Sequence, residues 1–364
     1  MSTSNTLMQA NAQWSSRPAD QRFLSLTSMM SHFAERRQRS RGVVAPSKIL
    51  EFYPDEDNKG LFVKGGAGVG YAPSHWAFGQ LATLAESPAG YLRTLPSPIV
   101  ADCLNYKLRH VRPTEDVGLL LYKNGSSELL AATGPNYGRI WNEDVCKALC
   151  ERFGDGITGD WKVPGEFGQR VAITTENTTL YASDRDMFVF LADEEHRIAV
   201  PNRRNGEAGS LARGFFVWNS EVGKSTLGIG TFLFDYVCCN RIVWGAESYQ
   251  EIRIRHTASA PDRFVEEAMP VLNSMRLAST RPIEDAIKAA QAKKVDDVTK
   301  FLADRFGKRM ASTIAATHEI EEGRPIETLW DVTTAATAYA RSLKYTDQRV
   351  DLERQAGDIM NLAK

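Results

Sequence analysis

The sequence predicts an α+β protein in which antiparallel sheets built from hairpins pack against helices, followed by an all-helical C-terminal module. Three observations predict this fold class. Short apolar runs with strand spacing are joined by tight turns, and apolar residues at helical spacing interrupt these runs. From Thr280 onward, glycine and proline become sparse and only the helical period remains.

These shifts in pattern divide the chain into three parts. Residues 1–18 are polar and lack periodicity, which is typical of a mobile N-terminal arm. Residues 19–280 form the predicted α+β core domain, and a chain with 43% apolar residues can bury a sizeable core. Residues 281–364 form a helical C-terminal module, which we expect either to pack on the sheet domain or to serve self-association.

The first elements follow from periodicity and proline. Apolar residues at helical spacing predict a helix between Pro18 and Arg37. Extended structure is expected from Val43 to Tyr53, broken at Pro46, and a short strand at Leu61–Val63.

Capping and turn residues place the next elements. Ser74 and Ser97 can each start a helix. Asn124-Gly125 lies between two apolar strands and is the strongest hairpin signal in the chain. A helix capped by Asn142 is expected to follow that hairpin.

Further strands are expected at Arg170–Thr174, Thr179–Ala182 and Met187–Ala192. The polar segment 193–210 that follows predicts an exposed loop, and this loop would carry Arg203 and Arg204.

The most apolar and aromatic stretch runs from Gly214 to Thr257. It predicts two paired strands, on one of which Gly228 and Gly230 lie on the same face and leave room for another backbone, a helix or a flat ligand. In the strand that follows, Arg253 and Arg255 alternate with isoleucines, which indicates a half-buried strand with a cationic outer face.

Two glycine-containing segments invite comparison with nucleotide-binding loops. KGGAGVGY (Lys64–Tyr71) fits neither GxGxxG nor GxxxxGK[ST]. EVGKST (Glu221–Thr226) lacks the first glycine of a phosphate loop and continues as a strand rather than a helix. We therefore interpret EVGKST as a hairpin turn and reject an NTPase.

The sequence offers no metal, cofactor or catalytic motif. The five cysteines and six histidines lack the spacing of a zinc site, and there is no GxSxG elbow. Catalytic groups can assemble in space, so an unrecognised hydrolase or nuclease stays open, but a non-catalytic protein is favoured. Without a signal peptide or an apolar run of roughly twenty residues, we expect no membrane span and a location in the cytoplasm of the host cell.

Clusters of cations are the main functional signal. The net charge of −1 excludes binding of a polyanion by bulk charge, so any such site must be local. Contact with phosphates needs cations along an open surface, with exposed aromatic residues beside them for unpaired bases. The candidate nucleic-acid-binding residues are Arg36, Arg37, Arg39, Arg41, Lys48, Arg203, Arg204, Arg253, Arg255 and His256. Separate solvated faces explain the same residues, and cations also favour helix C-termini.

Three segments resemble the phage/plasmid-like protein family called domain of unknown function 932. They are YGRIWNEDV (Tyr137–Val145), the stretch Trp218–Gly245 and the IRIRHT ending at Thr257. The resemblance covers about residues 20–280 and leaves the C-terminal module outside. The family has no established activity, so the resemblance implies a phage or mobile-element origin rather than a mechanism.

The organisation of hairpins, helices and sheet is also similar, at the level of fold, to the single-strand annealing proteins of phage recombination systems. That similarity implies a ring or filament that binds single strands in a basic groove. We therefore expect a non-catalytic, homo-oligomeric phage protein that binds single-stranded DNA through a basic sheet face. The alternative is a structural or host-interaction phage protein without nucleic-acid binding, which the nearly neutral charge and the helical module favour.

Overall fold

The computed structural model describes residues 17–65, 68–110, 115–164, 172–203, 207–235, 240–242, 251–277, 279–343 and 346–363. The α+β class with antiparallel sheets and C-terminal helices is confirmed. Most of the predicted N-terminal arm lies outside the described residues, as do Arg170, Arg204 and the pair Cys238 and Cys239.

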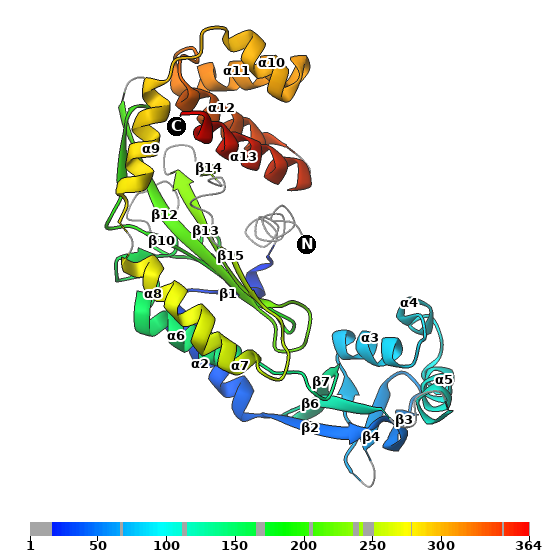
Figure 1. The fold of residues 1–364 in the computed structure, drawn as a ribbon. Helices are drawn as coiled ribbons and strands as arrows, with labels where there is room; N and C mark the ends of the chain where they lie inside the picture. Colours follow the sequence, from blue (N-terminus) through cyan, green and yellow to red (C-terminus); the bar gives the residue numbers. More distant parts are fainter. Residues whose placement is uncertain are drawn as a thin grey trace.

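A small lobe at one end of the molecule contains a sheet with the strand order β2-β6-β7-β5 and a separate hairpin, β3–β4 (Figure 1). Its strands are β2 (Ser40–Pro46), β3 (Leu50–Pro54), β4 (Leu61–Gly65), β5 (Ala72–Pro73), β6 (Asp116–Asn124) and β7 (Ser126–Thr133). Its helices are α3 (His75–Leu84), α4 (Ala89–Leu92) and α5 (Ser97–His110). Leucines from both layers, among them Leu50, Leu81, Leu104 and Leu119, close its core.

Local signals predicted this lobe well. The hairpin at Asn124-Gly125 is confirmed, and Gly125 has a φ of 75°, a conformation that glycine adopts without a steric penalty. The Ser74 side chain accepts a hydrogen bond from the amide of Ala77, so it caps α3 as expected. Pro46 ends β2, and a short 3-10 turn at Ser47–Ile49 separates it from β3.

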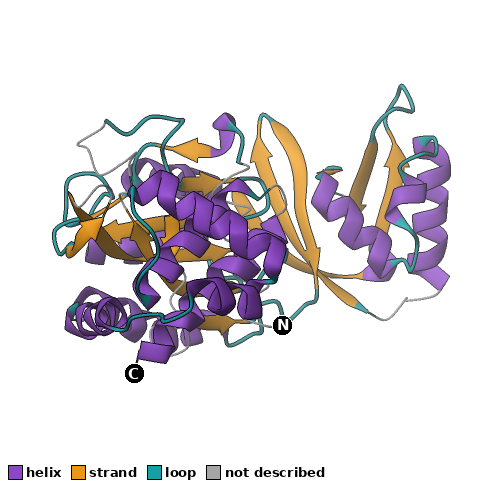
Figure 2. Cartoon of the chain, turned by 90° about the horizontal axis from the view of Figure 1, so that it is seen from above, coloured by secondary structure: helices purple, strands orange, loops and turns teal. Residues whose placement is uncertain are grey.

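The large lobe contains an antiparallel sheet in which β1-β9-β10-β12-β13-β14 are neighbours, while β8, β11 and β15 pair with β10, β12 and β13 respectively. The strands are β1 (Arg22–Phe23), β8 (Trp161–Lys162), β9 (Leu180–Ala182), β10 (Met187–Asp193), β11 (Ile198–Arg203), β12 (Glu207–Asn219), β13 (Leu227–Asp235), β14 (Asn240–Ile242) and β15 (Glu251–Ile254). Figure 2 shows this lobe set apart from the small one.

Helices cover one face of this sheet (Figure 1). They are α2 (Leu26–Gln38), α6 (Asn142–Phe153), α7 (Ala260–Arg263) and α8 (Met269–Leu277), with a π-helical stretch at Phe264–Ala268 between the last two. Sheet residues such as Val189, Phe215 and Ile229 pack against helical residues such as Phe33 and Leu149 in one buried cluster. Alternate residues of each strand point to this face, because side chains in a strand alternate.

The other face of the same sheet carries aromatic rings. Phe188 lies opposite Trp218 and Phe190 opposite Phe216, and the Phe216 and Trp218 rings stack with centroids 5.5 Å apart. A Cβ atom on Gly228 would lie 1.8 Å from the Trp218 ring, and one on Gly230 would lie 2.6 Å from the Phe216 ring. The room that the two glycines leave is therefore filled by the chain's own aromatic side chains.

The C-terminal helices pack on the sheet. They are α9 (Arg281–Ala292), α10 (Val298–Phe306), α11 (Lys308–Glu322), α12 (Leu329–Ser342) and α13 (Thr346–Met360). Ile198, Val200, Leu211 and Leu233 of the sheet join the hydrophobic cluster of these helices. Within the described residues, no helix has both the length and the hydropathy to cross a membrane.

Several local predictions were wrong. Segment 193–210 is not an exposed loop, because β11 lies within it and the Arg203 side chain, 1% exposed, bonds Glu322 of α11. Ile198 and Val200 belong to a short apolar run between polar residues and pack against helices distant in sequence, so the polar composition of the segment concealed this strand. Residues 172–174 form no strand. Asn142 lies inside the first turn of α6, and Trp141 is the residue that precedes it as the N-cap.

Candidate nucleic-acid interface

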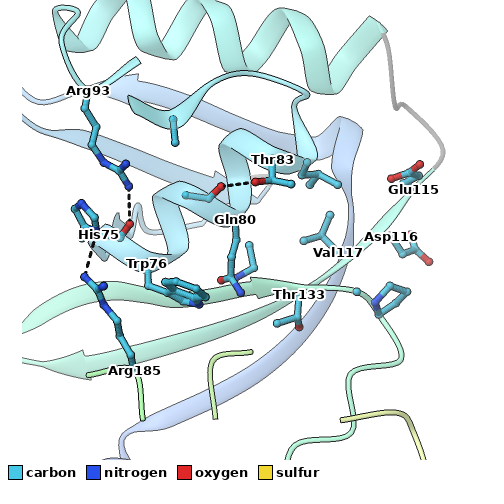
Figure 3. Close-up of a pocket in the computed structure, with 16 residues that line it drawn as sticks. His75, Trp76, Gln80, Thr83, Arg93, Glu115, Asp116, Val117, Thr133 and Arg185 are labelled. Carbon is cyan, nitrogen blue, oxygen red and sulfur yellow. Dashed lines mark hydrogen bonds between the residues drawn. The ribbon is translucent and has the colours of Figure 1, made fainter. Parts of the chain in front are cut away.

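A cleft of about 910 Å³ lies beside α3, where the start of β6 and the end of β7 also line it and the turn of residues 183–186 in the large lobe contributes Arg185. His75, Trp76, Gln80 and Arg93 line it from the small lobe, and Arg185 lines it from the large lobe (Figure 3). Its size is within the range of cavities that hold small molecules or one unit of a polymer.

One end of the cleft is cationic and aromatic. The Arg185 guanidinium lies 5.8 Å from the centre of the Trp76 ring, and its Nη2 atom lies 3.1 Å from Nδ1 of His75. Arg93 lies 5.0 Å from the centre of the Phe78 ring and donates from Nη2 to the His75 carbonyl oxygen at 2.9 Å. This end of the cleft therefore holds two guanidinium groups and an imidazole, with one guanidinium beside an indole and the other beside a phenyl ring.

The opposite end of the cleft is acidic. Glu115 and Asp116 precede and begin β6, and both are exposed there. Figure 3 shows these two carboxylates across the cleft from His75, Arg93 and Arg185. A ligand with a negative end and a hydrogen-bond-donating end would be oriented, because its negative end is attracted to the guanidinium groups and repelled by the carboxylates.

Hydrogen bonds and ion pairs from the large lobe fix the turn that carries Arg185. The Ser220 hydroxyl donates to the Arg185 carbonyl oxygen at 2.7 Å, and Arg36 donates to the Asp184 carbonyl oxygen at 2.8 Å. Asp186, at the end of the turn, is ion-paired at 2.5 Å with both Arg17 and Lys224. Burial alone would raise the pKa of Asp186, but these two cations outweigh it and hold the pKa below its ordinary value.

The EVGKST segment is a hairpin turn between β12 and β13, as the sequence predicts, and it joins the lobes. The indole N–H of Trp76 and the side-chain amide of Gln80 both donate to the Val222 carbonyl oxygen, at 2.9 and 2.7 Å. The Val222 side chain packs with Leu120 and Leu130 of the small lobe. Two residues that line the cleft thus also fix the contact between the lobes.

Glu221 in this turn is a buried carboxylate. Its Oε1 accepts the backbone N–H of Asn142 at 2.8 Å, and its Oε2 lies 4.0 Å from Nε of Arg36. Burial raises the pKa of Glu221 above its ordinary value, and the charges of Arg36 and Arg139 offset this only in part. The site is therefore structural in character, since it is closed to solvent.

The three segments that carry the family resemblance meet close to the EVGKST turn. His256 stacks on Tyr137 with ring centroids 4.9 Å apart, and its Nδ1 lies 3.1 Å from the Gly138 carbonyl oxygen. Burial lowers the pKa of His256 and raises that of Tyr137. A side chain at Gly138 would collide with the backbone of Thr257, which explains why glycine suits this position.

The structure places the predicted cations in different settings. Arg37 pairs with Glu143 and Asp144, and Arg39 pairs with Glu35. Carboxylates of the same chain therefore already balance the charge of both arginines. The other described candidates differ in exposure. Three are exposed, namely Arg41, Lys48 and Arg255, and four are half-buried or buried, namely Arg36, Arg203, Arg253 and His256. They do not share one surface, and Arg204 lies outside the described residues.

Arg253 lies on the aromatic face of the sheet rather than over open solvent. Its guanidinium is 5.9 Å from the centre of the Trp218 ring, which is only 3% exposed. The cleft residues His75, Arg93 and Arg185 were not among the predicted candidates. They are far apart in the sequence, and no local pattern links them.

The comparisons with known proteins agree with the resemblance at the level of the family. A family model described as "Domain of unknown function (DUF932)" matches residues 170–357, more than half of the chain, and the chain belongs to this family. The match includes most of the C-terminal helices, so the expected extent of 20–280 was wrong. No curated protein and no solved structure matches the chain.

Proposed function

We propose that this protein is a non-catalytic phage or mobile-element protein that binds single-stranded DNA, in the manner of single-strand annealing proteins in recombination. We assign the contact with the strand to the cleft between the lobes instead of the sheet face. The cationic and aromatic end of the cleft, where Arg185 lies beside the Trp76 ring and the His75 imidazole and Arg93 bonds the His75 backbone, is the observation that carries the proposal. Such a protein would act in the cytoplasm of the host cell.

The chemistry of this end fits an unpaired strand. Guanidinium groups bind phosphate oxygens, and an indole ring offers a surface on which an unpaired base stacks, with a contribution of about 1–3 kcal/mol per base. In a duplex the bases stack on each other, so the Trp76 ring would gain nothing there. The carboxylates of Glu115 and Asp116 at the other end repel phosphates and accept hydrogen bonds from base N–H groups.

The test is a fluorescence-anisotropy titration of the full chain with a labelled single-stranded oligonucleotide at several salt concentrations. Neutralising two phosphate contacts in an Arg93→Ala/Arg185→Ala variant should lower the slope of log K against log salt by about 1.4, because each contact to a single strand contributes about 0.7. A matched Lys48→Ala/Arg255→Ala variant removes two exposed cations outside the cleft and should leave affinity and slope unchanged.

The outcomes separate the alternatives. Absence of binding at low salt would contradict the proposal and leave the structural or host-interaction role. Loss of binding in the Lys48→Ala/Arg255→Ala variant but not in the cleft variant would show that the cleft is the wrong surface. Equal affinity for a duplex of the same length would contradict base stacking on Trp76.

A further inference from the structure

Two large apolar side chains on the outer side of α5 face solvent, beside the exposed Asp102. Ile99 and Tyr106 are 49% and 64% exposed, Cys103 lies between them, and the His110 ring lies 5.0 Å from the Tyr106 ring. Positions 99, 103, 106 and 110 fall on one side of a helix. The opposite side of α5 closes the core of the small lobe through Leu104. A helix that served only to cover this lobe would be polar on its outer side.

A second exposed stripe lies on α11. Ile320 is 83% exposed, and Thr313 and Ala316 share its side of the helix and are exposed as well. The buried side of α11 packs into the C-terminal helices through Ala311 and Ile314. Small residues beside Ile320 let another helix approach closely.

The last turns of the two helices carry opposite charge. The last turn of α5 carries Lys107, Arg109 and His110. The last turn of α11 carries only acidic charge, and acidic residues at a helix C-terminus oppose the helix dipole. Arg203 and Arg341 pair with two of these carboxylates, Glu322 and Glu321. Glu319 is exposed, and no partner for it exists among the described residues.

The stripes lie at opposite ends of the molecule, α5 at the far end of the small lobe and α11 in the C-terminal helices (Figure 1). They therefore cannot meet within one chain. We infer that the α5 stripe of one copy binds the α11 stripe of a second copy, with the cationic end of α5 beside Glu319. Because the two surfaces differ, this contact is head-to-tail and continues into a ring or a filament.

The test uses the full chain and mass photometry, with size-exclusion chromatography at higher concentration. The wild type should form assemblies larger than a dimer. Tyr106→Glu and Ile320→Glu should each yield monomers without a change in Tm, because both side chains are exposed. Leu277→Glu is the matched control, since Leu277 is 82% exposed but lies on α8, and it should assemble as the wild type does.

Mixing the two variants tests the head-to-tail geometry. Tyr106→Glu keeps a working α11 stripe and Ile320→Glu keeps a working α5 stripe, so an equimolar mixture should form heterodimers and nothing larger. A symmetric contact, in which each stripe binds its own kind, would leave no heterodimer in the mixture. Monomeric wild type at tens of micromolar, or loss of assembly in Leu277→Glu, would overturn the inference. The experiment contains no nucleic acid, so its outcome is independent of the proposed function.

Discussion

Two arginine–tryptophan pairs in this protein have nearly the same geometry and opposite surroundings. Arg253 lies 5.9 Å from the Trp218 ring and Arg185 lies 5.8 Å from the Trp76 ring. Trp218 is 3% exposed on the aromatic face of the sheet, whereas Trp76 is half-buried and lines the cleft. A cation beside an indole is therefore not a binding site by itself, and the access of solvent decides which pair can meet a ligand.

The largest expected effect is the loss of stability when the buried pair, Arg253 and Trp218, is disrupted. Trp218→Ala should lower the free energy of unfolding by about 3–5 kcal/mol, as truncation of a buried tryptophan does. Chemical denaturation followed by circular dichroism measures this. Affinity for single-stranded oligonucleotide should stay unchanged under conditions where the variant is folded. A fall in affinity without a fall in stability would contradict the division between the two pairs.

A second substitution sharpens this result. Gly228→Ala places a methyl group 1.8 Å from the Trp218 ring, and such overpacking should destabilise the protein by about 1–3 kcal/mol or more. In the Trp218→Ala background the ring is gone, so the added cost of Gly228→Ala should vanish. Additive costs in this double-mutant cycle would mean that the glycine is required for another reason.

Substitutions in the pair that lines the cleft, Arg185 and Trp76, should change affinity more than stability. Trp76→Phe keeps a ring for stacking but loses the hydrogen bond to Val222, at a cost of about 1 kcal/mol in stability. Trp76→Ala also removes the stacking surface, so its affinity for an oligonucleotide should fall by a further amount on the order of 1–3 kcal/mol. Anisotropy titrations of both variants separate the ring from the hydrogen bond. Equal affinities would argue against stacking.

Substitution of Arg36 tests how the turn that carries Arg185 is positioned. It donates to the carbonyl oxygens of Ser183 and Asp184 and so fixes the turn that carries Arg185. Arg36→Ala should weaken oligonucleotide binding several-fold while leaving the salt slope unchanged, because no phosphate contact is lost. Arg185→Ala should lower the slope by about 0.7. A reduced slope in Arg36→Ala would make Arg36 itself a contact residue.

The sequence could predict the parts of this fold that depend on neighbours in the chain. The Asn124-Gly125 hairpin, the Ser74 cap and the EVGKST turn are local, so each was predicted correctly. Arg203 was misplaced because its partner Glu322 is 119 residues away. The cleft was missed for the same reason, since Arg185 reaches His75 and Trp76 only when the 183–186 turn packs beside α3.

The smallest expected effect concerns a sealed histidine, His318 on α11, which is 1% exposed. Neither ring nitrogen has a hydrogen-bond partner among the described residues, and burial lowers the pKa of His318 below its ordinary value of 6.5. The nearby carboxylates of Asp331 and Glu322 favour the charged form, but the guanidinium groups of Arg324 and Arg203 oppose it. Unlike the residues of the cleft, His318 is too buried to contact a ligand.

The sign of the pH dependence follows from that lowered pKa. Between the folded pKa and 6.5 the unfolded chain binds more protons than the folded one, so stability falls as pH drops below 6.5 and levels off under the folded pKa. His318→Leu removes this proton-binding group from both states. The difference in unfolding free energy between variant and wild type should therefore shift in favour of His318→Leu as the pH falls from 7 to 5. Denaturation curves at those two pH values measure it, and a constant difference would show that His318 does not titrate on unfolding.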